Sequence, residues 1–400
     1  MMGNTPNIRF KGFTDDWEQR KFPEFVSFYN GLTYTPNDIQ EMGTLVLRSS
    51  NVKNGEIVDA DNVYVNDKVA TSENVQVGDI IVVVRNGSRA LIGKHAQIKA
   101  SMPNTVIGAF MSGIRSGQSS FVNALLDTSA FENEIAKNMG ATINQITGYM
   151  FSKMEFMVPS EEEQQQIGQY FSNLDHLITL HQRKCDETKK LKKFMLQKMF
   201  PKKDEKKPEI RFAGFTDDWE QRKLGEVFQE YSEKNHPELP ALTIIQGGGT
   251  VLREKSERKL QYDKSSLAWY KMVREDDFIV HLRSFEGGLE KSNHNGLISP
   301  AYHTFHGDEV DSRFYYPYFR SYEFIKHKLV PHVYGIRDGR SIDIDGMKTI
   351  EIPWTSYEEQ KKIGDYIESL DTLITLHQRK CDEIKKIKKF MLQNMFPQKG

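Results

Sequence analysis

The residue types in this chain that could carry out catalysis are sparse, and their spacing favours structural roles. The best candidates for metal ligands are three consecutive acids, Glu275, Asp276 and Asp277, which a Mg²⁺-dependent nuclease could use. In the stretch VREDDFIV, however, they have the pattern of a turn before a buried strand. The chain contains no P-loop, no Gly-x-Gly-x-x-Gly fingerprint and no Gly-x-Ser-x-Gly elbow. We therefore expect no catalytic site, and a nuclease with unrecognised acidic ligands stays an alternative.

A histidine and a cysteine recur four residues apart in two copies of the sequence HQRKC. His181 precedes Cys185, and His377 precedes Cys381, so each pair would share one face of a helix. Two polar ligands on one helix face are common by chance, and a zinc site needs more of them. Two cysteines also cannot build a disulfide framework. We expect these residues to occupy an apolar helix seam, with no metal.

The His–Cys pairs belong to a stretch that the chain contains twice, at 167–200 and 363–396. Apolar residues recur there in alternating steps of three and four, the pattern of a long helix with one narrow apolar seam. Prolines stand before and after each copy, as at helix boundaries: Pro159, Pro201, Pro353 and Pro397. A long helix with a single seam needs one partner, and the obvious partner is the other copy. Because domain and helix alternate along the chain, we expect antiparallel pairing as a coiled coil.

A second repeated stretch leads into each domain. Residues 8–21 read IRFKGFTDDWEQRK and residues 210–223 read IRFAGFTDDWEQRK, so the chain is a tandem duplication. The segments that follow, 22–158 and 224–352, share only patchy similarity. Both combine strand-like runs, which end in polar or Gly-rich loops, with helical stretches, and this predicts two mixed α/β (α+β) domains. In the first domain the Asn54-Gly55 pair is a turn signal that predicts a hairpin, and residues 119–139 have helical spacing.

These repeats predict a pseudo-two-fold tandem repeat of five parts. We expect a first domain with its lead-in segment at 1–158, a first spacer helix at 159–201, a linker at 202–209, a second domain with its lead-in segment at 210–352, and a second spacer helix at 353–400.

Length and composition limit the number of domains and the class of protein. The 400 residues allow two or three domains, and the hydrophobic content of 38% is low, as long solvated helices would make it. The formal net charge of −1 gives no indication of a nucleic-acid partner. The start MMGNTPNIRFKGF lacks the apolar run of a secretory signal, and no apolar stretch is long enough to cross a bilayer. We expect a soluble, cytoplasmic protein.

The duplicated frame with two unlike domains resembles the specificity subunit of type I restriction–modification systems. The resemblance is carried by VPSEEEQQQIGQYFSNLDHLI at 158–178 and IPWTSYEEQKKIGDYIESLDTLI at 352–374, which open the two long helices. The strand end at Leu47–Asn51, the GDI-type strand at 75–84 and the IRF-x-GF-x-x-x-W lead-in segments look like the same family. The resemblance covers nearly the whole chain.

This resemblance implies a non-catalytic, sequence-specific DNA-binding subunit that takes part in DNA methylation and host defence. The two domains would be target recognition domains that each read half of a split, asymmetric double-stranded DNA site. The helices would fix the unread gap, because half-sites on one face of a duplex lie about one helical turn, ~34–36 Å, apart.

The family also implies partners. The helices would hold two methyltransferase (modification) subunits, and motor–nuclease (restriction) subunits would join outside. S-adenosylmethionine, ATP and Mg²⁺ would bind those partners, and this chain would hold no cofactor. Two other functions stay open: a coiled-coil adaptor with two protein-binding domains, and the Mg²⁺-dependent nuclease mentioned above.

Base reading needs Arg, Lys, Asn or Gln on loops that can enter a groove of DNA, and phosphate contacts need Lys, Arg, Ser or Thr. In the first domain we expect DNA contacts from Arg48, Ser49, Asn51, Arg85, Asn86, Ser88, Arg89, Lys94 and Gln145, with Thr142 and Asn144 as weaker candidates. In the second we expect them from Arg283, Ser284, Lys291, His303, Arg337 and Arg340, with Tyr334 as a packing aromatic.

Any one of these residues could instead be an ordinary surface charge or turn former, but as a group they favour DNA contact. Segment 22–158 has ten Lys and Arg residues against thirteen Asp and Glu residues. A DNA-binding face there must therefore be a local patch on an otherwise acidic domain.

Overall fold

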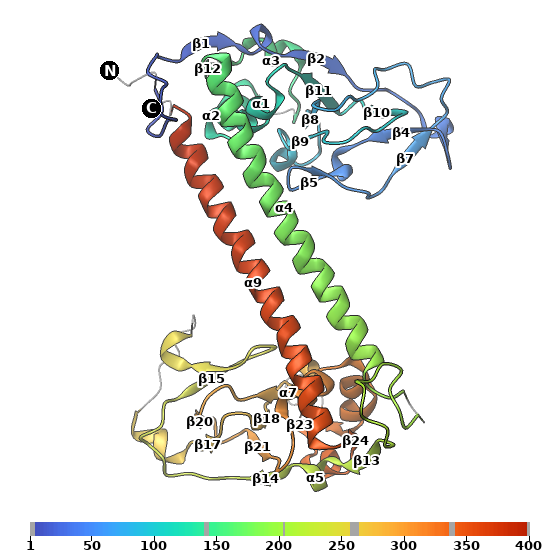
Figure 1. Cartoon of the computed structure of the whole chain (residues 1–400), viewed down its shortest axis with the longest axis vertical. Coiled ribbons are helices and arrows are strands. Elements are labelled where there is room, and N and C mark those ends of the chain that lie inside the picture. The colour runs from blue at the N-terminus through green and yellow to red at the C-terminus, as the bar shows by residue number, and fades with distance from the viewer. Residues whose placement is uncertain (1–4, 140–143, 203–204, 257–263, 336–340, 398–400) are drawn as a thin grey trace. The chain divides into compact units, whose positions relative to one another are not determined.

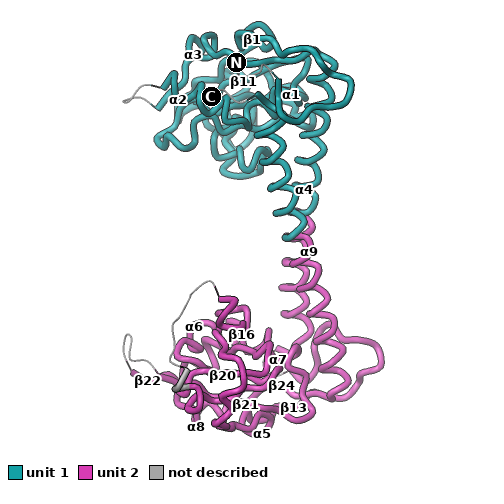
Figure 2. Tube along the Cα trace, turned by 90° about the vertical axis from the view of Figure 1, so that its left-hand side faces the viewer, with its two compact units in different colours: residues 1–182, 378–400 teal, residues 183–377 magenta. Residues whose placement is uncertain are grey.

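The computed structural model describes residues 5–139, 144–202, 205–256, 264–335 and 341–397 of the chain. The chain divides into two compact units: unit 1 comprises residues 1–182 and 378–400, and unit 2 comprises residues 183–377 (Figure 2). Each unit contains one α/β domain and one part of each long helix (Figure 1).

The long helices are α4, Glu161–Lys198, and α9, Tyr357–Met395. In unit 1, Lys388 of α9 donates to Asp175 of α4 at 2.5 Å, and the Sγ of Cys381 lies 3.9 Å from the carbonyl oxygen of Ile178. Residue numbers therefore rise along α4 while they fall along α9, and the helices run antiparallel.

Unit 2 repeats this arrangement with the helices exchanged. Lys192 of α4 donates to Asp371 of α9 at 2.6 Å, and the Sγ of Cys185 lies 3.8 Å from the carbonyl oxygen of Ile374. The predicted antiparallel pairing is thus confirmed within each unit, and both cysteines are buried in the seam. Within the described ranges, no helix is both long enough and apolar enough to cross a membrane.

Unit 1 contains two four-stranded sheets. The strands of the central sheet are all antiparallel and have the order β2 (Ser27–Asn30), β11 (Met111–Arg115), β8 (Ile80–Val83) and β9 (His95–Gln97). The second sheet has the order β10 (Thr105–Ile107), β4 (Thr44–Leu47), β7 (Val63–Val65) and β3 (Ile39–Gln40), with β10 and β4 parallel. The lead-in strand β1 (Glu18–Lys21) pairs with β12 (Glu155–Val158), which precedes α4.

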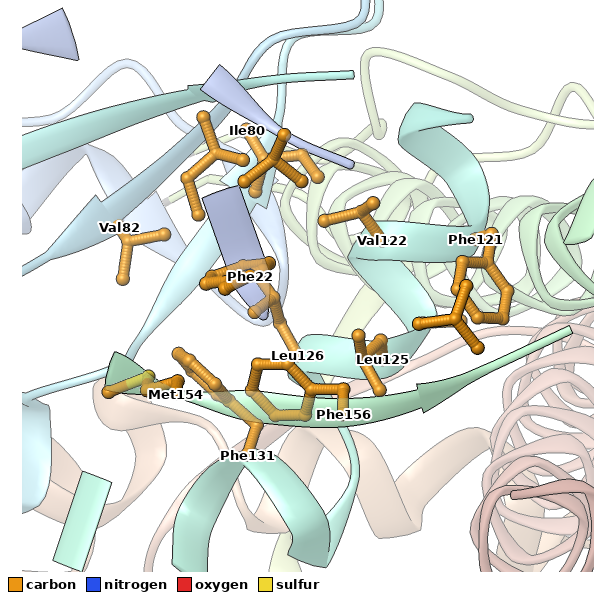
Figure 3. Packing of buried hydrophobic residues seen from close by; sticks show 14 of the residues in the cluster. Phe22, Ile80, Val82, Phe121, Val122, Leu125, Leu126, Phe131, Met154 and Phe156 are labelled. Carbon is orange, nitrogen blue, oxygen red and sulfur yellow. The ribbon is translucent and has the colours of Figure 1, made fainter. Parts of the chain in front are cut away.

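One face of the central sheet of unit 1 is covered by helices. These are α1 (Ser119–Leu126), α2 (Ser129–Asn138) and α3 (Gly148–Lys153). Ile80 and Val82 project from β8 into a core with Phe22, Phe121, Phe131 and Phe156 (Figure 3). The alternation of β8 explains this, because residues two apart in a strand face the same side of the sheet.

Two local details of unit 1 bear on the sequence predictions. The Asn54-Gly55 turn forms a hairpin between β5 (Val52–Lys53) and β6 (Glu56–Ile57), with positive φ angles of 54° and 75° at the two turn residues. The helical stretch 119–139 is two helices rather than one, because the chain turns at Asp127 and Thr128. Asp127 is thereby free to reach Lys388 of α9, at 2.7 Å.

Unit 2 has a central antiparallel sheet of the order β14 (Gln229–Tyr231), β21 (His303–His306), β18 (Phe278–Val280) and β19 (Glu290–Lys291). Its other strands form the pairs β13–β24 (Glu220–Lys223 and Glu351–Trp354), β15–β16 (Leu242–Ile245 and Gly249–Leu252), β17–β20 (Lys271–Val273 and Gly296–Ile298) and β22–β23 (Val333–Tyr334 and Ser341–Ile342). Its shorter helices are α5 (Leu224–Val227), α6 (Ser284–Gly287), α7 (Ser312–Phe319) and α8 (Ile344–Lys348).

The central sheets of the two units have the same connectivity. β2, β11, β8 and β9 of unit 1 correspond in order to β14, β21, β18 and β19 of unit 2. The register corresponds too, since Ile80 lies opposite Ile114 and Phe278 lies opposite Phe305. The two domains share only patchy sequence similarity, yet each contains a central sheet with the same strand order and register.

Candidate nucleic-acid interface

The loop that follows β4 presents Arg48 and Ser49 and is held from within by Asn51. The Asn51 side chain is fully buried, donates to the carbonyl oxygen of Ala60 at 2.8 Å and accepts from the Arg48 amide at 2.8 Å. Asn51 therefore shapes the loop, and the expectation that it contacts DNA is corrected. The Arg48 guanidinium binds the carboxylate of Asp61 at 2.6 Å.

The loop that follows β8 lies against the first one. The Asn86 side chain donates to the Ser49 hydroxyl at 3.3 Å, and Lys94 donates to the Ser49 carbonyl oxygen at 3.2 Å. Burial lowers the pKa of Lys94, and the positive charge of Lys53 lowers it further. Ser88 and Arg89 are exposed at the end of this loop. Two predicted segments about 40 residues apart thus form one surface.

Residues 144–145 complete this surface. The Asn144 carbonyl oxygen accepts from the Asn86 amide at 3.4 Å, and the Asn144 side chain donates to the carbonyl oxygen of Gly87 at 3.1 Å. Gln145 forms an isolated antiparallel bridge with Arg85. Thr142, the other candidate in this stretch, lies outside the described residues.

Phe110 is a residue of this surface that the sequence prediction missed. It lies between β10 and β11, and its side chain is 56% exposed. The guanidinium carbon of Arg85 lies 5.1 Å from the centre of its ring. An aromatic residue in a short loop between two apolar strands was the available signal, but a loop aromatic is more often packed than exposed. We call residues 48–50, 85–89, 94, 109–110 and 144–145 the polar surface of unit 1.

A buried ion cluster anchors the strand that leads to this surface. Asp79, directly before β8, accepts from the Tyr29 hydroxyl at 2.8 Å and from Arg115 at 2.8 Å. Burial by itself would raise the pKa of Asp79, but the bonds from Arg115, the Gln76 amide and Tyr29 outweigh it and lower the pKa. Asp277 in unit 2 has the equivalent place before β18, where it binds Tyr231 and His306.

In unit 2 the equivalent loop follows β18 and contains Arg283 and Ser284. Arg283 is exposed, and its amide donates to the Nδ1 of His281 at 3.3 Å. Ser284 is fully buried, and its hydroxyl accepts from the amide of His281 at 2.9 Å. Ser284 therefore closes the turn before α6, and its predicted DNA contact is corrected for the same reason as that of Asn51.

Lys291 and His303 lie toward opposite ends of β18, so the structure does not bring these two candidates together. Lys291 is opposite Phe278 and binds Asp276 at 2.6 Å, whereas His303 is opposite Val280 and binds Glu230 at 2.7 Å. Both side chains are already bound to a carboxylate. Of the two, only His303 is at the end of β18 that leads to Arg283.

Three further candidates of unit 2 have separate outcomes. Arg337 and Arg340 lie outside the described residues. Tyr334 is on β22 with its side chain 60% exposed, so it does not pack as predicted.

Two acids of the stretch considered for a nuclease, Asp276 and Asp277, bind other side chains of unit 2. Asp276 binds Lys291 and accepts from the Ser312 hydroxyl at 2.7 Å, and Asp277 is buried with Tyr231 and His306. In the described part of the chain, no group of three or more His, Cys, Asp or Glu residues is arranged to hold a metal ion.

A comparison with known protein families matches residues 14–190 to the type I restriction modification DNA specificity domain. The matched segment contains the polar surface of unit 1 and runs into α4. This segment of the chain, somewhat less than half of its length, is similar to that domain.

Two relatives of the specificity-subunit family come from Methanocaldococcus jannaschii. The type I restriction enzyme MjaVIII specificity subunit is 26% identical over 64% of this chain and 64% of its own length. The protein named as the MjaX specificity subunit is 25% identical over 94% of this chain and 91% of its own length. These matches confirm the resemblance seen in the sequence.

A solved structure shares the fold. The crystal structure of a type-I restriction-modification system S subunit from M. genitalium matches 99% of this chain and 100% of its own, with a TM-score of 0.65 and 15% identity. The predicted fold class, two mixed α/β domains with two long helices in a tandem repeat, is therefore confirmed.

Proposed function

We propose that this chain reads a split, asymmetric double-stranded DNA site as the non-catalytic specificity subunit of a type I restriction–modification complex. Residues 1–158 and 210–352 would be the two recognition domains, one for each half-site. Segments 159–201 and 353–400 would be the spacer helices, with the linker at 202–209. The observation that carries this proposal is the polar surface of unit 1, where predicted base-reading residues from separate loops meet in an otherwise acidic domain.

The asymmetry of the site would follow from the loops. Each domain has a central sheet with the same strand order. In each, an arginine (Arg85 or Arg283) follows the buried aspartate (Asp79 or Asp277) by six residues. The loops around these arginines differ in length and sequence, with a polar Ser49 neighbour in unit 1 and helix α6 in unit 2. Two equivalent scaffolds with different loops would read different bases.

The long helices would carry the methyltransferase subunits. Leu177 of α4 and Ile387 and Phe390 of α9 are exposed large apolar side chains in unit 1. Ile387 and Phe390 are three residues apart and therefore share one face of α9. The equivalent side chains of unit 2, Leu373, Leu191 and Phe194, are exposed as well. Exposed apolar stripes of this kind mark protein interfaces. The restriction subunits would join outside, and S-adenosylmethionine, ATP and Mg²⁺ would be bound by the partners.

Methylation mapping tests the proposal. The chain is co-expressed with the methyltransferase subunit from its own locus, and the methylated bases are mapped across the host genome. We expect a split motif with an unread gap. Exchange of residues 22–158 for the equivalent domain of a relative should change one half of the motif and leave the other unchanged. An intact complex that methylates no motif would contradict the proposal and favour the adaptor function.

Cleavage of DNA by the purified chain alone in Mg²⁺ would instead favour the nuclease. The D276N/D277N double variant is the control for that result, because it removes the acids that a nuclease would need.

A further inference from the structure

Arg85 occupies a fixed backbone position at the centre of the polar surface of unit 1. It follows β8 by two residues, and its amide donates to the carbonyl oxygen of Phe110 at 3.2 Å. On its other side it forms an antiparallel bridge with Gln145. The base of this side chain is therefore held between two other segments, although the residue itself is exposed.

The Arg85 side chain is oriented by Phe110. Its guanidinium carbon lies 5.1 Å from the centre of the Phe110 ring, within the range of a cation–π contact. A guanidinium that lies over a ring keeps the N–H groups of its planar edge available for hydrogen bonds. Phe110 remains 56% exposed, so this edge and the ring face solvent together.

Three of the neighbouring cations, Arg48, Lys94 and Arg115, are committed to the protein. Arg48 binds Asp61 at 2.6 Å, and Lys94 donates to the Ser49 carbonyl oxygen at 3.2 Å. Arg115, below the surface, binds Asp79 at 2.8 Å. Among the described residues, no carboxylate forms an ion pair with the Arg85 guanidinium, so its hydrogen-bonding edge is not satisfied by the domain.

We propose that Arg85, placed over the Phe110 ring, reads a guanine in the half-site bound by residues 1–158. This inference rests on the proposed function. A guanidinium edge matches the O6 and N7 acceptors that guanine presents in the major groove, and both can be bound at once. Phe110 is a positioning residue, because it acts by restricting the directions in which the arginine can point.

The decisive variant is R85K, which keeps the positive charge and removes the two-pronged edge. The complex of the full chain with its methyltransferase subunit is tested on oligonucleotides in which each base pair of the motif is replaced in turn. The wild type should prefer G·C at one position of the first half-site by about 5- to 150-fold, the range of a two-pronged arginine contact. R85K should reduce this preference to nearly one while binding to unrelated DNA stays unchanged.

Three matched variants sharpen the test. R89K changes a nearby exposed arginine without an aromatic partner and should leave the preference intact. F110A should weaken the preference at the same position, and F110Y, which retains the ring, should restore it. R283K should affect only the second half-site.

Two results would overturn the inference. One is an R85K complex that keeps the wild-type preference for G·C, because a phosphate contact needs only the positive charge that lysine retains. The other is a first half-site motif without a required G·C pair. A wild-type complex without any motif would contradict the proposed function itself, so the two failures are distinguishable. The half-site that a variant leaves unchanged, the second for changes at Arg85, Arg89 and Phe110 and the first for R283K, shows that the complex is folded.

Discussion

Units 1 and 2 share a nearly identical frame. In unit 1 the lead-in residue Arg9 forms a two-pronged bond with the buried Glu163 of α4, with both distances 2.7 Å. In unit 2 Arg211 binds Glu359 of α9 in the same way, at 2.6 and 2.8 Å. The same residue types in the same order produce the same contacts twice.

The units differ where the domain meets the frame. Lys388 in unit 1 lies between Asp175 of the other helix and Asp127 of the domain, and all three side chains are largely shielded from solvent. Its duplicate in unit 2, Lys192, binds only the half-exposed Asp371, the duplicate of Asp175. Burial by the first domain lowers the pKa of Lys388, but the two carboxylates outweigh this effect, and the pKa is raised.

The duplicated lysines Lys388 and Lys192 therefore bind duplicated aspartates, but the two ion pairs do not contribute equally to the free energy of unfolding. The helix sequence determines that the lysine pairs with the aspartate. The domain that covers the pair decides whether the contact is a weak surface ion pair or a shielded cluster whose loss is costly.

The largest expected effect comes from removing this lysine. K388M leaves Asp127 and Asp175 side by side without a cation, and we expect a loss of about 3–5 kcal/mol in the free energy of unfolding of unit 1. The matched variant K192M should cost no more than about 1 kcal/mol, because its pair is exposed. Urea denaturation, with hydrogen exchange of α1 and α7 to separate the units, measures both. Equal losses would contradict the role of the domain.

The next effect concerns the buried aspartate below the polar surface. D79N removes the ion pair with Arg115, and we expect a loss of about 2–3 kcal/mol at neutral pH. Because folding lowers the pKa of Asp79, its contribution is present above the ordinary carboxyl pKa of 3.8 and is lost as the pH falls through the folded value. The stabilities of D79N and the wild type should therefore converge in acid.

Denaturation curves between pH 7 and pH 3 measure this convergence. A difference that is constant over the whole range would mean that the charge of Asp79 does not matter. D277N is the comparison in unit 2, where a histidine has the place of the arginine.

A smaller difference should separate two duplicated glycines. A Cβ on Gly168 would lie 2.7 Å from the backbone nitrogen of Phe121, whereas one on Gly364 would lie 2.9 Å from a side-chain oxygen of Asp311. A backbone atom cannot move aside as readily as a side chain. We expect G168A to destabilise its unit by about 1–3 kcal/mol and G364A by less. Thermal denaturation of the two variants gives the order, and a larger loss for G364A would contradict it.

The smallest effect should be the same in both units. Glu18 binds Arg20 at 2.7 Å and Glu220 binds Arg222 at 2.8 Å, and both pairs are on the surface. We expect E18A and E220A each to change stability by less than about 1 kcal/mol. A clear difference between these variants would mean that the frames are less alike than their sequences.

The sequence by itself determined the frame. The 3.5-residue seam and the duplication predicted two long helices in antiparallel contact, because a narrow apolar stripe can be covered only by a similar stripe. It also predicted the turn at Asn54 and Gly55, which depends on local conformation alone. The Leu47–Asn51 strand end and the helix motifs indicated the family.

Only the tertiary structure decided which polar residues are available. Asn51 and Arg48 have similar loop positions in the sequence, but the Asn51 side chain is fully buried and the Arg48 side chain is only half-buried. Phe110 becomes a support for Arg85 because two strands distant in sequence end side by side. Burial and partners across the fold are long-range properties, whereas sequence patterns report local periodicity, so the site was predictable as a group of loops but not as individual contacts.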